Sequence, residues 1–570
     1  MAGSIQSSSS IAQAIASTPA VVTAEDLAKS DLWIFREGRR QFSGLALVGE
    51  LRQRLSAENA LLDCLIQAGE LEAALADVGV PDVSDAMAIT DALAQRLCAG
   101  QVETGDLANL AGIIQAPENL SVSPPEGFTY YALHPLDFVN AGEQISNCST
   151  NYAVLGIRSI GTTLSAVIAA EMSRLGKKVS RITVRPQGHP YSRITIFSPR
   201  EQAWIAEQQS RSAQFVIVDE GPGRSGSTFL SVAEALCRAG IAADQIVVVG
   251  SREFDPSSLC AQGAAERWQR FRFVTAPSSL SRRFTGFRYI GGGDWRQHFC
   301  DGELNWPESW TQMERFKVLS ADRSHFIKFE GMGRIGKEAR DRAFALAKAG
   351  FSPVVSDIGD GFLSYATING KSLQRRDLNA EVLENIARYC TFRAAEFSCT
   401  APRESELEQM LIHNVREEFG REIKVDPGLL SLHGPVLADG RMQPHEWIAS
   451  SGKIIKTDAV SHGDNHFFPG PCGIAWDLAG TIIEWDLGTA ATEFLVARFQ
   501  QLSGANASLE LDAYILAYCV FRLGFCKMAR STVQGTAEEL RLHIAYQRYR
   551  AKAAQLLEKS SNESLSWINV

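Results

Sequence analysis

The sequence has no hydrophobic run that approaches the roughly 18 residues needed to cross a bilayer, so we expect no membrane-spanning segment. It has no C-x-x-C pair among its 11 scattered cysteines, which disfavours a zinc site and favours reduced thiols in the cytoplasm. It also lacks a basic excess: the net charge is −9, whereas nucleic-acid binding usually shows a basic footprint. We therefore expect a cytoplasmic protein without membrane or nucleic-acid partners.

The length and composition indicate a multidomain globular chain. Its 570 residues, 45% hydrophobic and 21% charged, suffice for about three to four domains. Residues 1–25 lack both a basic start and a proper apolar block, and we interpret them as a disordered tail. Residues 26–127 show apolar residues at three- and four-residue spacing, which predicts a helical extension that covers the next domain. No internal repeat is evident.

Residues 128–285 follow a proline-containing break and alternate between apolar runs and helical patterns. Repeated units of strand, short loop and helix predict a largely parallel sheet with helices on both faces. Residues 178–197 differ, because they predict two strands around a polar turn. Ligands of parallel sheets bind beyond the carboxyl ends of the strands, where we expect two glycine-containing loops to lie.

The most informative stretch is FVIVDEGPGRSGST, residues 215–228. It predicts a buried strand, two adjacent acids and a glycine- and hydroxyl-rich loop that opens a helix. Asp219 and Glu220 can accept hydrogen bonds from the vicinal hydroxyls of a sugar. The loop and the helix N-terminus behind it favour a phosphate. The residues expected to hold that phosphate are Gly221, Gly223, Arg224, Ser225, Gly226, Ser227 and Thr228.

This strand, acidic pair and loop resemble the motif with which type I phosphoribosyltransferases bind 5-phosphoribosyl 1-pyrophosphate (PRPP), and the resemblance covers residues 128–280. In that family an earlier loop holds the pyrophosphate. Its counterpart here contains Arg158, Ser159, Gly161 and Thr162.

The same family commonly has a mobile basic hairpin over the reacting centre. Residues 185–193 stand in that place, where Arg185, His189 and Arg193 are candidates to neutralise the departing pyrophosphate. A solvated turn is the alternative. The resemblance implies PRPP as substrate, Mg²⁺ as cofactor and catalytic roles for Asp219, Glu220 and Arg185. It does not identify the acceptor.

Residues 286–570 begin with short strand-like runs and become mostly helical. Lys328 falls in an apolar strand and Glu338 at the start of a helix, and such a pair can hold the α- and β-phosphates of ATP. Residues 361–373, GFLSYATINGKSL, resemble the hinge segment of aminoglycoside-phosphotransferase-like kinases, the small-molecule branch of the protein-kinase fold. This resemblance implies a bilobal kinase-like domain that binds ATP and Mg²⁺.

The acidic residues of that kinase-like domain allow two registers. In the first, Asp464 of an HGD triplet orients the substrate hydroxyl and Asp477 holds the metal, although Pro469 stands where the family has an asparagine. In the second, Asp458 is the base, and Asp464 or Asn465 takes the second metal role. An inactive pseudokinase is a third alternative.

Together these patterns predict an α/β and α+β multidomain transferase whose partners are small molecules, and a homodimer is left open. The leading hypothesis is a bifunctional enzyme. One activity transfers a phosphoribosyl group between PRPP and a nitrogenous small molecule, in either direction, and the other uses ATP to phosphorylate a small-molecule hydroxyl. The alternatives are a non-catalytic nucleotide- or PRPP-sensing regulatory protein and a protein in which only one domain is active.

Overall fold

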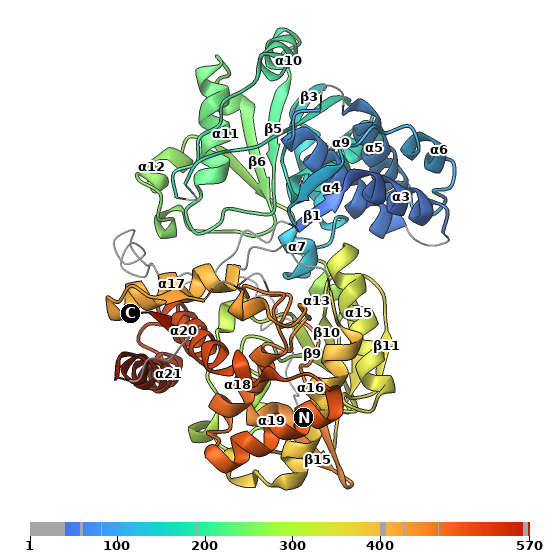
Figure 1. Ribbon diagram of the computed structural model, residues 1–570. Helices are drawn as coiled ribbons and strands as arrows, with labels where there is room; N and C mark the ends of the chain where they lie inside the picture. The colour runs from blue at the N-terminus through green and yellow to red at the C-terminus, as the bar shows by residue number, and fades with distance from the viewer. Residues whose placement is uncertain are drawn as a thin grey trace, which may run out of the picture. The chain divides into compact units, whose positions relative to one another are not determined.

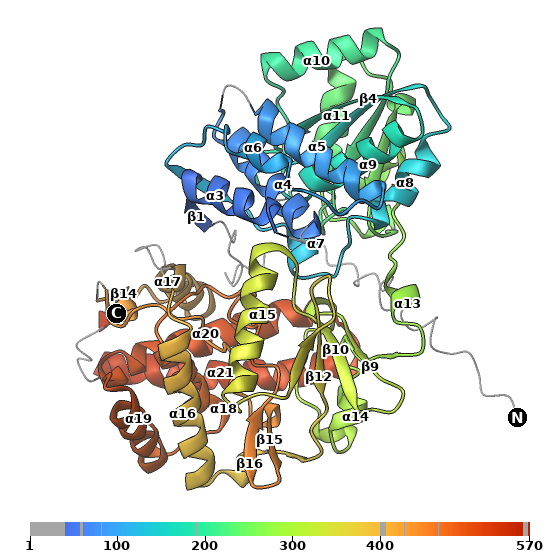
Figure 2. The same ribbon diagram turned by 90° about the vertical axis from the view of Figure 1, so that its right-hand side faces the viewer.

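The structure is a computed structural model that describes residues 40–57, 61–80, 83–189, 191–399, 406–426, 428–465, 467–562 and 568–569. The described chain forms two compact units, drawn in Figures 1 and 2. The first runs to Phe287 and includes Gly331–Lys337, and the second contains Arg288–Glu330 and the chain from Glu338 onward. The disordered tail expected at residues 1–25 lies outside the described residues.

A five-stranded parallel sheet with the order β4-β3-β5-β6-β7 forms the centre of the first unit. This confirms the parallel sheet predicted from the sequence. The inner strands are continuous apolar runs because helices cover both faces of the sheet. The strands are β3 (Asn151–Ile157), β4 (Lys178–Val184), β5 (Gln214–Val218), β6 (Ile246–Gly250) and β7 (Arg272–Thr275).

The strand order reverses between β3 and β5. The chain passes from β3 to β4 on one side of β3 and then returns to place β5 on its other side. In open parallel sheets the loops after two such strands diverge and leave a crevice in which ligands bind. The carboxyl ends of β3 and β5 therefore define the place where a ligand site is expected in this unit.

Helix α9 (Ile160–Arg174) is buried from Ile160 to Met172 because it is covered on two sides. The sheet packs on one side, and α4 (Leu61–Asp77), α5 (Ser84–Cys98) and α8 (Asp137–Ile145) pack on the other, as Figure 1 shows for the first two. The remaining N-terminal elements are β1 (Arg40–Ser43), α3 (Gly44–Leu55), α6 (Leu107–Ala111), β2 (Asn119–Val122) and α7 (Glu126–Thr129).

The opposite face of the sheet packs against α11 (Ser227–Arg238) (Figure 1). Leu155, Ile217 and Phe229 belong to the apolar core on this side. The other elements of the unit are α10 (Pro199–Ser210), α12 (Ala264–Trp268) and α13 (Leu280–Arg283).

One local prediction was wrong. Within residues 178–197 the strand β4 covers Lys178–Val184, and an isolated bridge between Gln187 and Ile194 connects the two sides of the polar turn beyond it. Ile196 is 82% exposed, whereas the Thr195 hydroxyl lies 2.8 Å from that of Ser231 on α11. The run alternates as a strand does, but it packs against a helix and has no continuous strand neighbour.

The second unit begins with a five-stranded antiparallel sheet of order β11-β12-β10-β9-β8. Helix α15 (Gly333–Lys348) connects β10 to β11 and runs beside the sheet in Figure 2. The strands are β8 (Arg288–Tyr289), β9 (Lys317–Leu319), β10 (His325–Phe329), β11 (Val355–Asp357) and β12 (Phe362–Ala366). The short helix α14 (Arg296–Phe299) follows β8.

The rest of the second unit is mainly helical and contains the largest apolar core, in which Trp447, Trp476 and Tyr518 are fully buried. A hairpin of β15 (Trp447–Ser450) and β16 (Lys453–Lys456) pairs with β13 (Lys371–Ser372). The helices are α16 (Ala380–Glu396), α17 (Glu406–Phe419), α18 (Ala475–Glu484), α19 (Thr489–Ser503), α20 (Leu511–Arg530) and α21 (Ala537–Asn562), and β14 (Lys424–Val425) pairs with β17 (Ile568–Asn569).

Among the described residues, no helix combines the length and the apolar character that crossing a bilayer would require.

A buried ion-pair network joins the helical extension to the sheet of the first unit. Arg181 on β4 donates to both carboxylate oxygens of Glu72 at 2.9 Å and to Asp91 at 2.7 Å. We expect Arg181→Met to lower the free energy of unfolding of this unit by about 3–5 kcal/mol, because it leaves buried carboxylate charge without a partner. Urea unfolding, followed through hydrogen exchange of peptides from β4, measures the loss.

The matched control is Arg211→Met, which removes an exposed ion pair with Glu207. Its expected effect is at most about 1 kcal/mol, because solvent screens exposed pairs. Equal losses in the two variants would contradict the structural role of the buried network.

Candidate functional site

The N-terminus of α9, which follows β3, lies against the end of β5 at the point where the strand order reverses. A Cβ atom added to Gly161 would lie 2.6 Å from the carbonyl oxygen of Val218 and 3.4 Å from the Cα of Asp219. Only glycine permits this approach. The close contact brings together the two segments for which the sequence predicts pyrophosphate and ribose phosphate binding.

Both loops lead directly into helix N-termini. Ser159, immediately before α9, has φ of +97° and ψ of −124°, and Gly226, immediately before α11, has φ of +67°. A non-glycine residue with positive φ is strained, and such strain is concentrated at functional sites. The first N–H groups of each helix have no partner within the helix and carry partial positive charge. The crevice is thus suited to an anion.

The hydroxyl groups of the second loop are partly used by the loop itself. Ser225 Oγ accepts a hydrogen bond from the Ser227 N–H at 3.2 Å and donates one to Ser227 Oγ at 3.0 Å. Both side chains are buried, whereas Gly223 is exposed and Thr228 is half-buried. Ser225 therefore shapes the loop, and the phosphate-binding roles of these residues stay predictions.

Three carboxyl groups share the space beside the loops. Burial raises the pKa of Asp219 to about 8 and that of Glu220 to about 7. The third is Glu126 of α7, whose pKa burial and then the charges of Glu220 and Asp219 raise to about 8. A Cβ atom added to Gly127 would lie 3.0 Å from Glu220 Oε2, which shows how closely α7 approaches the acidic pair.

Sequence reasoning missed Glu126. No motif spacing relates it to the acidic pair, which lies more than 90 residues further along the chain. Its only local signal is the preceding Pro124–Pro125 break, which indicates an ordered turn but no ligand.

The arginines predicted to bind pyrophosphate are held by the last residue of α4. Asp77 accepts hydrogen bonds from Arg185 Nε at 3.1 Å and Nη2 at 2.5 Å, and from Arg158 Nη1 at 3.3 Å. Arg185 Nη1 also donates to the carbonyl oxygen of Arg158 at 2.9 Å. The two guanidinium groups are therefore adjacent, as a shared anion site requires. Their binding roles are untested and stay predictions.

The basic turn that precedes α10 lies near the second loop. Burial raises the pKa of the Tyr191 hydroxyl, and the nearby Arg224 guanidinium lowers it. Within the turn, Arg193 Nη1 donates to the carbonyl oxygen of Gly188 at 2.5 Å, and His189 Nδ1 accepts the N–H of Tyr191 at 3.2 Å. The positive charge of Arg224 in the loop therefore acts on Tyr191 of the turn.

In the second unit, Lys328 on β10 contacts Asp458, which lies two residues after the end of the β15–β16 hairpin. Its Nζ lies 2.5 Å from Asp458 Oδ1, 3.0 Å from Ser461 Oγ and 3.0 Å from Glu330 Oε1. Lys317, directly opposite Lys328 on β9, lies 3.5 Å from Asp458 Oδ2. Burial opposes the charge of Asp458, but the two lysines hold its pKa well below the usual range.

The expected pairing of Lys328 with Glu338 is not formed. Among the residues that the structure describes, the acidic partners of Lys328 are Glu330, two residues further along the chain, and Asp458. Glu330 takes this place because it is buried and faces the same side of the strand as Lys328. The ATP-binding role of Glu338 stays a prediction.

The first of the two registers for the acidic residues finds no support in the geometry. Asp464 is 1% exposed and forms an ion pair with Arg342 of α15. Asp477 is fully buried, and its two oxygens accept the N–H groups of Asp439 at 2.8 Å and Gly440 at 3.1 Å. These contacts position neighbouring segments, and the roles of Asp464 and Asp477 toward substrate and metal stay predictions.

In the second register, Asp458 lies beside Lys328, and its role as the base stays a prediction. Asn465 Oδ1 accepts the N–H of Phe467 at 3.0 Å and thereby shapes its own loop. The acid that sequence reasoning missed is Asp439, which precedes the hairpin as Asp458 follows it. Residues 447–456, WIASSGKIIK, alternate on both sides of an SSG turn. This pattern is the signal that could have predicted a hairpin before the HGD triplet.

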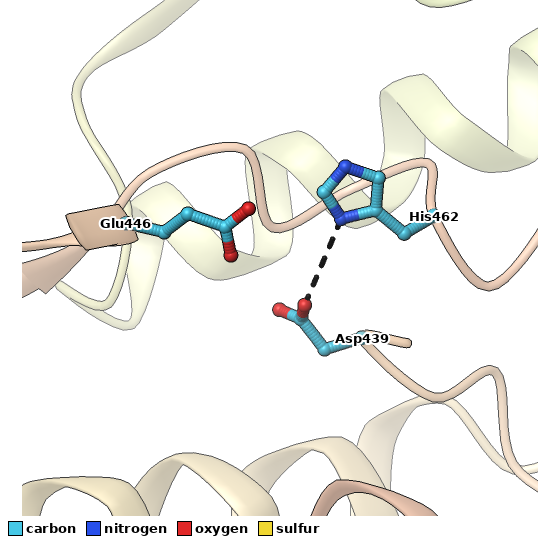
Figure 3. A group of neighbouring side chains, drawn as sticks. All are labelled: Asp439, Glu446 and His462. Carbon is cyan, nitrogen blue, oxygen red and sulfur yellow. Dashed lines mark ion pairs between the residues drawn. The ribbon is translucent and has the colours of Figure 1, made fainter. Parts of the chain in front are cut away.

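Asp439, Glu446 and His462 form a cluster in which one ligand atom from each lies within 4.8 Å of the others (Figure 3). His462 Nδ1 is 3.9 Å from Asp439 Oδ1, and its Nε2 is 3.4 Å from Asp458 Oδ2. Carboxylate and imidazole groups are ligands of divalent metal ions such as Mn²⁺ or Zn²⁺.

The ammonium group of Lys456 already contacts two of these potential ligands. It is 2.8 Å from Glu446 Oε2 and 3.3 Å from Asp439 Oδ2, and its side chain is fully buried. Burial opposes its charge, but Asp439 and Glu446 raise its pKa above the ordinary value. A divalent ion therefore does not fit between these two carboxylates while Lys456 keeps this position.

No protein-family model and no curated protein matches this chain. Solved structures that resemble part of it are small-molecule kinases. Choline kinase LicA from Streptococcus pneumoniae has 13% identity and a TM-score of 0.29 over 42% of this chain and 89% of its own. A Plasmodium vivax ethanolamine kinase has 10% identity and a TM-score of 0.30 over 59% and 97%.

A choline/ethanolamine kinase family protein from Mesorhizobium loti has 12% identity and a TM-score of 0.28 over 46% of this chain and 97% of its own. At these values the likenesses decide neither the fold nor the activity of the chain.

The raised pKa values of the three carboxyl groups predict how the stability of the first unit depends on pH. A carboxyl group whose pKa is raised on folding stabilises the folded state below its unfolded pKa of about 4, and this stabilisation is lost as the pH rises through the folded value. For Asp219 the folded pKa is about 8. We therefore expect Asp219→Asn to unfold at a higher urea concentration than the wild type at pH 9 and at a similar one at pH 5.

Asp244→Asn, at an exposed position of the same unit, serves as the control and should leave the pH dependence unchanged. If Asp219→Asn loses stability between pH 5 and pH 9 as steeply as the wild type, Asp219 does not lie in the poorly solvated place described here.

Proposed function

We propose that the first unit binds PRPP and transfers its phosphoribosyl group to, or from, a nitrogenous small molecule. The single observation that supports this most is the approach of Gly161 to the end of β5. Asp219 lies beside the N-terminus of α9, so the groups proposed to bind the ribose and the pyrophosphate would adjoin each other. A ligand with a sugar diol between a phosphate and a pyrophosphate matches this arrangement.

Each group of the site has a chemical task in this reaction. Departure of pyrophosphate leaves positive charge on the ribose ring, which ionised Asp219 and Glu220 would stabilise while they accept the ribose hydroxyls. The amides before α9 and α11 would hold the two phosphate ends. Arg158 and Arg185 would bind the leaving pyrophosphate through charge-assisted hydrogen bonds.

The carboxyl groups of Asp219 and Glu220 are the hard oxygen ligands that would hold Mg²⁺ here. Within the described residues their oxygens do not form, with Glu126, a compact ligand group like that of Asp439, Glu446 and His462. When bound, Mg²⁺ would supply positive charge to the pyrophosphate. The same geometry is compatible with a PRPP sensor that binds without turnover, because binding and chemistry use the same contacts.

For the second unit we propose ATP-dependent phosphorylation of a small-molecule hydroxyl. The specific observation is the meeting of Lys328 with Asp458, while Asp439 precedes the same hairpin. A strand lysine, an acid after a hairpin and an acid before it are the parts with which kinases hold phosphates, hold metal and orient a hydroxyl. Asp458, which is partly exposed, is the residue that would hold Mg²⁺. A nucleotide receptor without turnover is the alternative.

PRPP binding tests the first proposal. With Mg²⁺ present, we expect the wild type to bind PRPP in calorimetry, and Asp219→Asn to bind it at least about tenfold more weakly, because a charge-assisted hydrogen bond is worth roughly 1.5–3 kcal/mol. Asp244→Asn should bind as the wild type does. Pyrophosphate release with a panel of nucleobases then separates enzyme from sensor. Absence of heat from wild-type protein would end this proposal.

ATP binding tests the second proposal separately. We expect Lys328→Met to weaken ATP binding at least about tenfold, since it removes a charged donor to the phosphates. Lys348→Met, at an exposed position at the end of α15, is the matched control and should have no effect. ADP release with small hydroxyl compounds reports turnover. Equal ATP affinity in the two lysine variants would contradict the proposed role of Lys328.

A further inference from the structure

Lys456 occupies a position at which the hairpin would otherwise place an apolar side chain. Strand β16 alternates, with Ile454 buried, Ile455 half-buried and Lys456 fully buried. A lysine at an inward-facing position is costly unless its charge is paired. Its partners are Glu446 at 2.8 Å and Asp439 at 3.3 Å, both of which come from the segment before the hairpin. The lysine therefore belongs to the charge balance of the carboxylate cluster.

Asp439 is held on both oxygens by groups of the protein itself. Its Oδ2 accepts a hydrogen bond from the Tyr389 hydroxyl and lies 4.0 Å from Arg393 Nη1, in addition to its contact with Lys456. Its Oδ1 accepts the N–H of Arg441 at 3.2 Å. These groups fix the orientation of the Asp439 carboxylate, and the ammonium group of Lys456 lies between it and Glu446.

His462 completes the set of potential ligands. Within the described part of the chain, its Nδ1 is a buried atom without a hydrogen-bond partner, and it lies 3.9 Å from Asp439 Oδ1. The carboxylates of Asp439 and Glu446 and the imidazole of His462 thus form one group of potential metal ligands. Within the described structure, Lys456 is the only lysine whose ammonium group contacts these carboxylates.

We propose that the ammonium group of Lys456 is the resident cation of this cluster and takes the place of a divalent metal ion between Asp439 and Glu446. This inference concerns the same site as the proposed phosphotransfer function, and its relevance to catalysis rests on that function. Asp439 keeps its charge and orientation without a metal, and a divalent ion that accompanies ATP is left to Asp458. The second unit would then differ from kinases that bind a metal ion on each side of the phosphates.

A metal titration without nucleotide tests the proposal on the full-length chain. Removing the ammonium group should leave two buried carboxylates and a histidine that can bind a metal ion. We therefore expect Lys456→Met to bind one Mn²⁺ ion at this cluster at least about tenfold more tightly than the wild type does. Paramagnetic resonance of free Mn²⁺ measures the binding. The double variant Lys456→Met/Glu446→Gln should lose the new site, which distinguishes it from sites elsewhere in the chain.

Lys453→Met is the matched control, because Lys453 lies in the same strand but is exposed, and it should bind Mn²⁺ as the wild type does. Lys456→Arg keeps the positive charge and should gain no site. Lys456→Gln preserves part of the hydrogen bonding and replaces Lys456→Met if that variant does not fold.

Two results would overturn the proposal: a wild-type Mn²⁺ site that Glu446→Gln abolishes, or folded Lys456→Met and Lys456→Gln proteins that bind no more Mn²⁺ than the wild type. Neither depends on ATP. Failure of ATP to bind would therefore count against the proposed phosphotransfer function and leave the metal result unaffected.

Discussion

The burial of carboxylate groups in both units is the constraint that shapes both candidate sites. Removing a carboxylate from water is costly enough that it is paired, hydrogen-bonded or protonated. Arg181 meets the requirement for Glu72 and Asp91 and so attaches the helical extension to the sheet. Lys456 meets it for Asp439 and Glu446.

The two candidate sites satisfy this constraint in opposite ways. In the first unit, burial raises the pKa values of Asp219 and Glu220 and outweighs the arginines near them. Burial and the charges of those two acids raise the pKa of Glu126. In the second unit, Lys317 and Lys328 lower the pKa of Asp458. Under the proposed function, a ligand that brings cations or hydroxyl groups would complete the first arrangement. The second is already neutralised by the chain, and a ligand must exchange partners with its lysines.

This contrast bears on the choice between enzyme and sensor. Perturbed carboxyl groups in a crevice mark functional sites, although buried ion-pair networks perturb pKa values as well. In the first unit the perturbed Asp219 lies beside the N-terminus of α9, which follows the strained Ser159. In the second unit most of the perturbed acids are members of ion-pair networks. The proposal for the first unit therefore rests on its perturbed acids, and that for the second unit rests on the contact between Lys328 and Asp458.

The sequence alone determined the parallel sheet, the two loops after β3 and β5, and the lysine-bearing strand β10, because apolar runs, glycine and helix starts are signals carried within a few neighbouring residues. Only the tertiary structure decided which charges meet. Glu126, Asp439 and Lys456 gain their importance from partners on other segments, and the failed pairing of Lys328 with Glu338 has the same origin. Hydrophobic periodicity reports on local burial, whereas the pairing of buried charges depends on contacts between segments that no local pattern encodes.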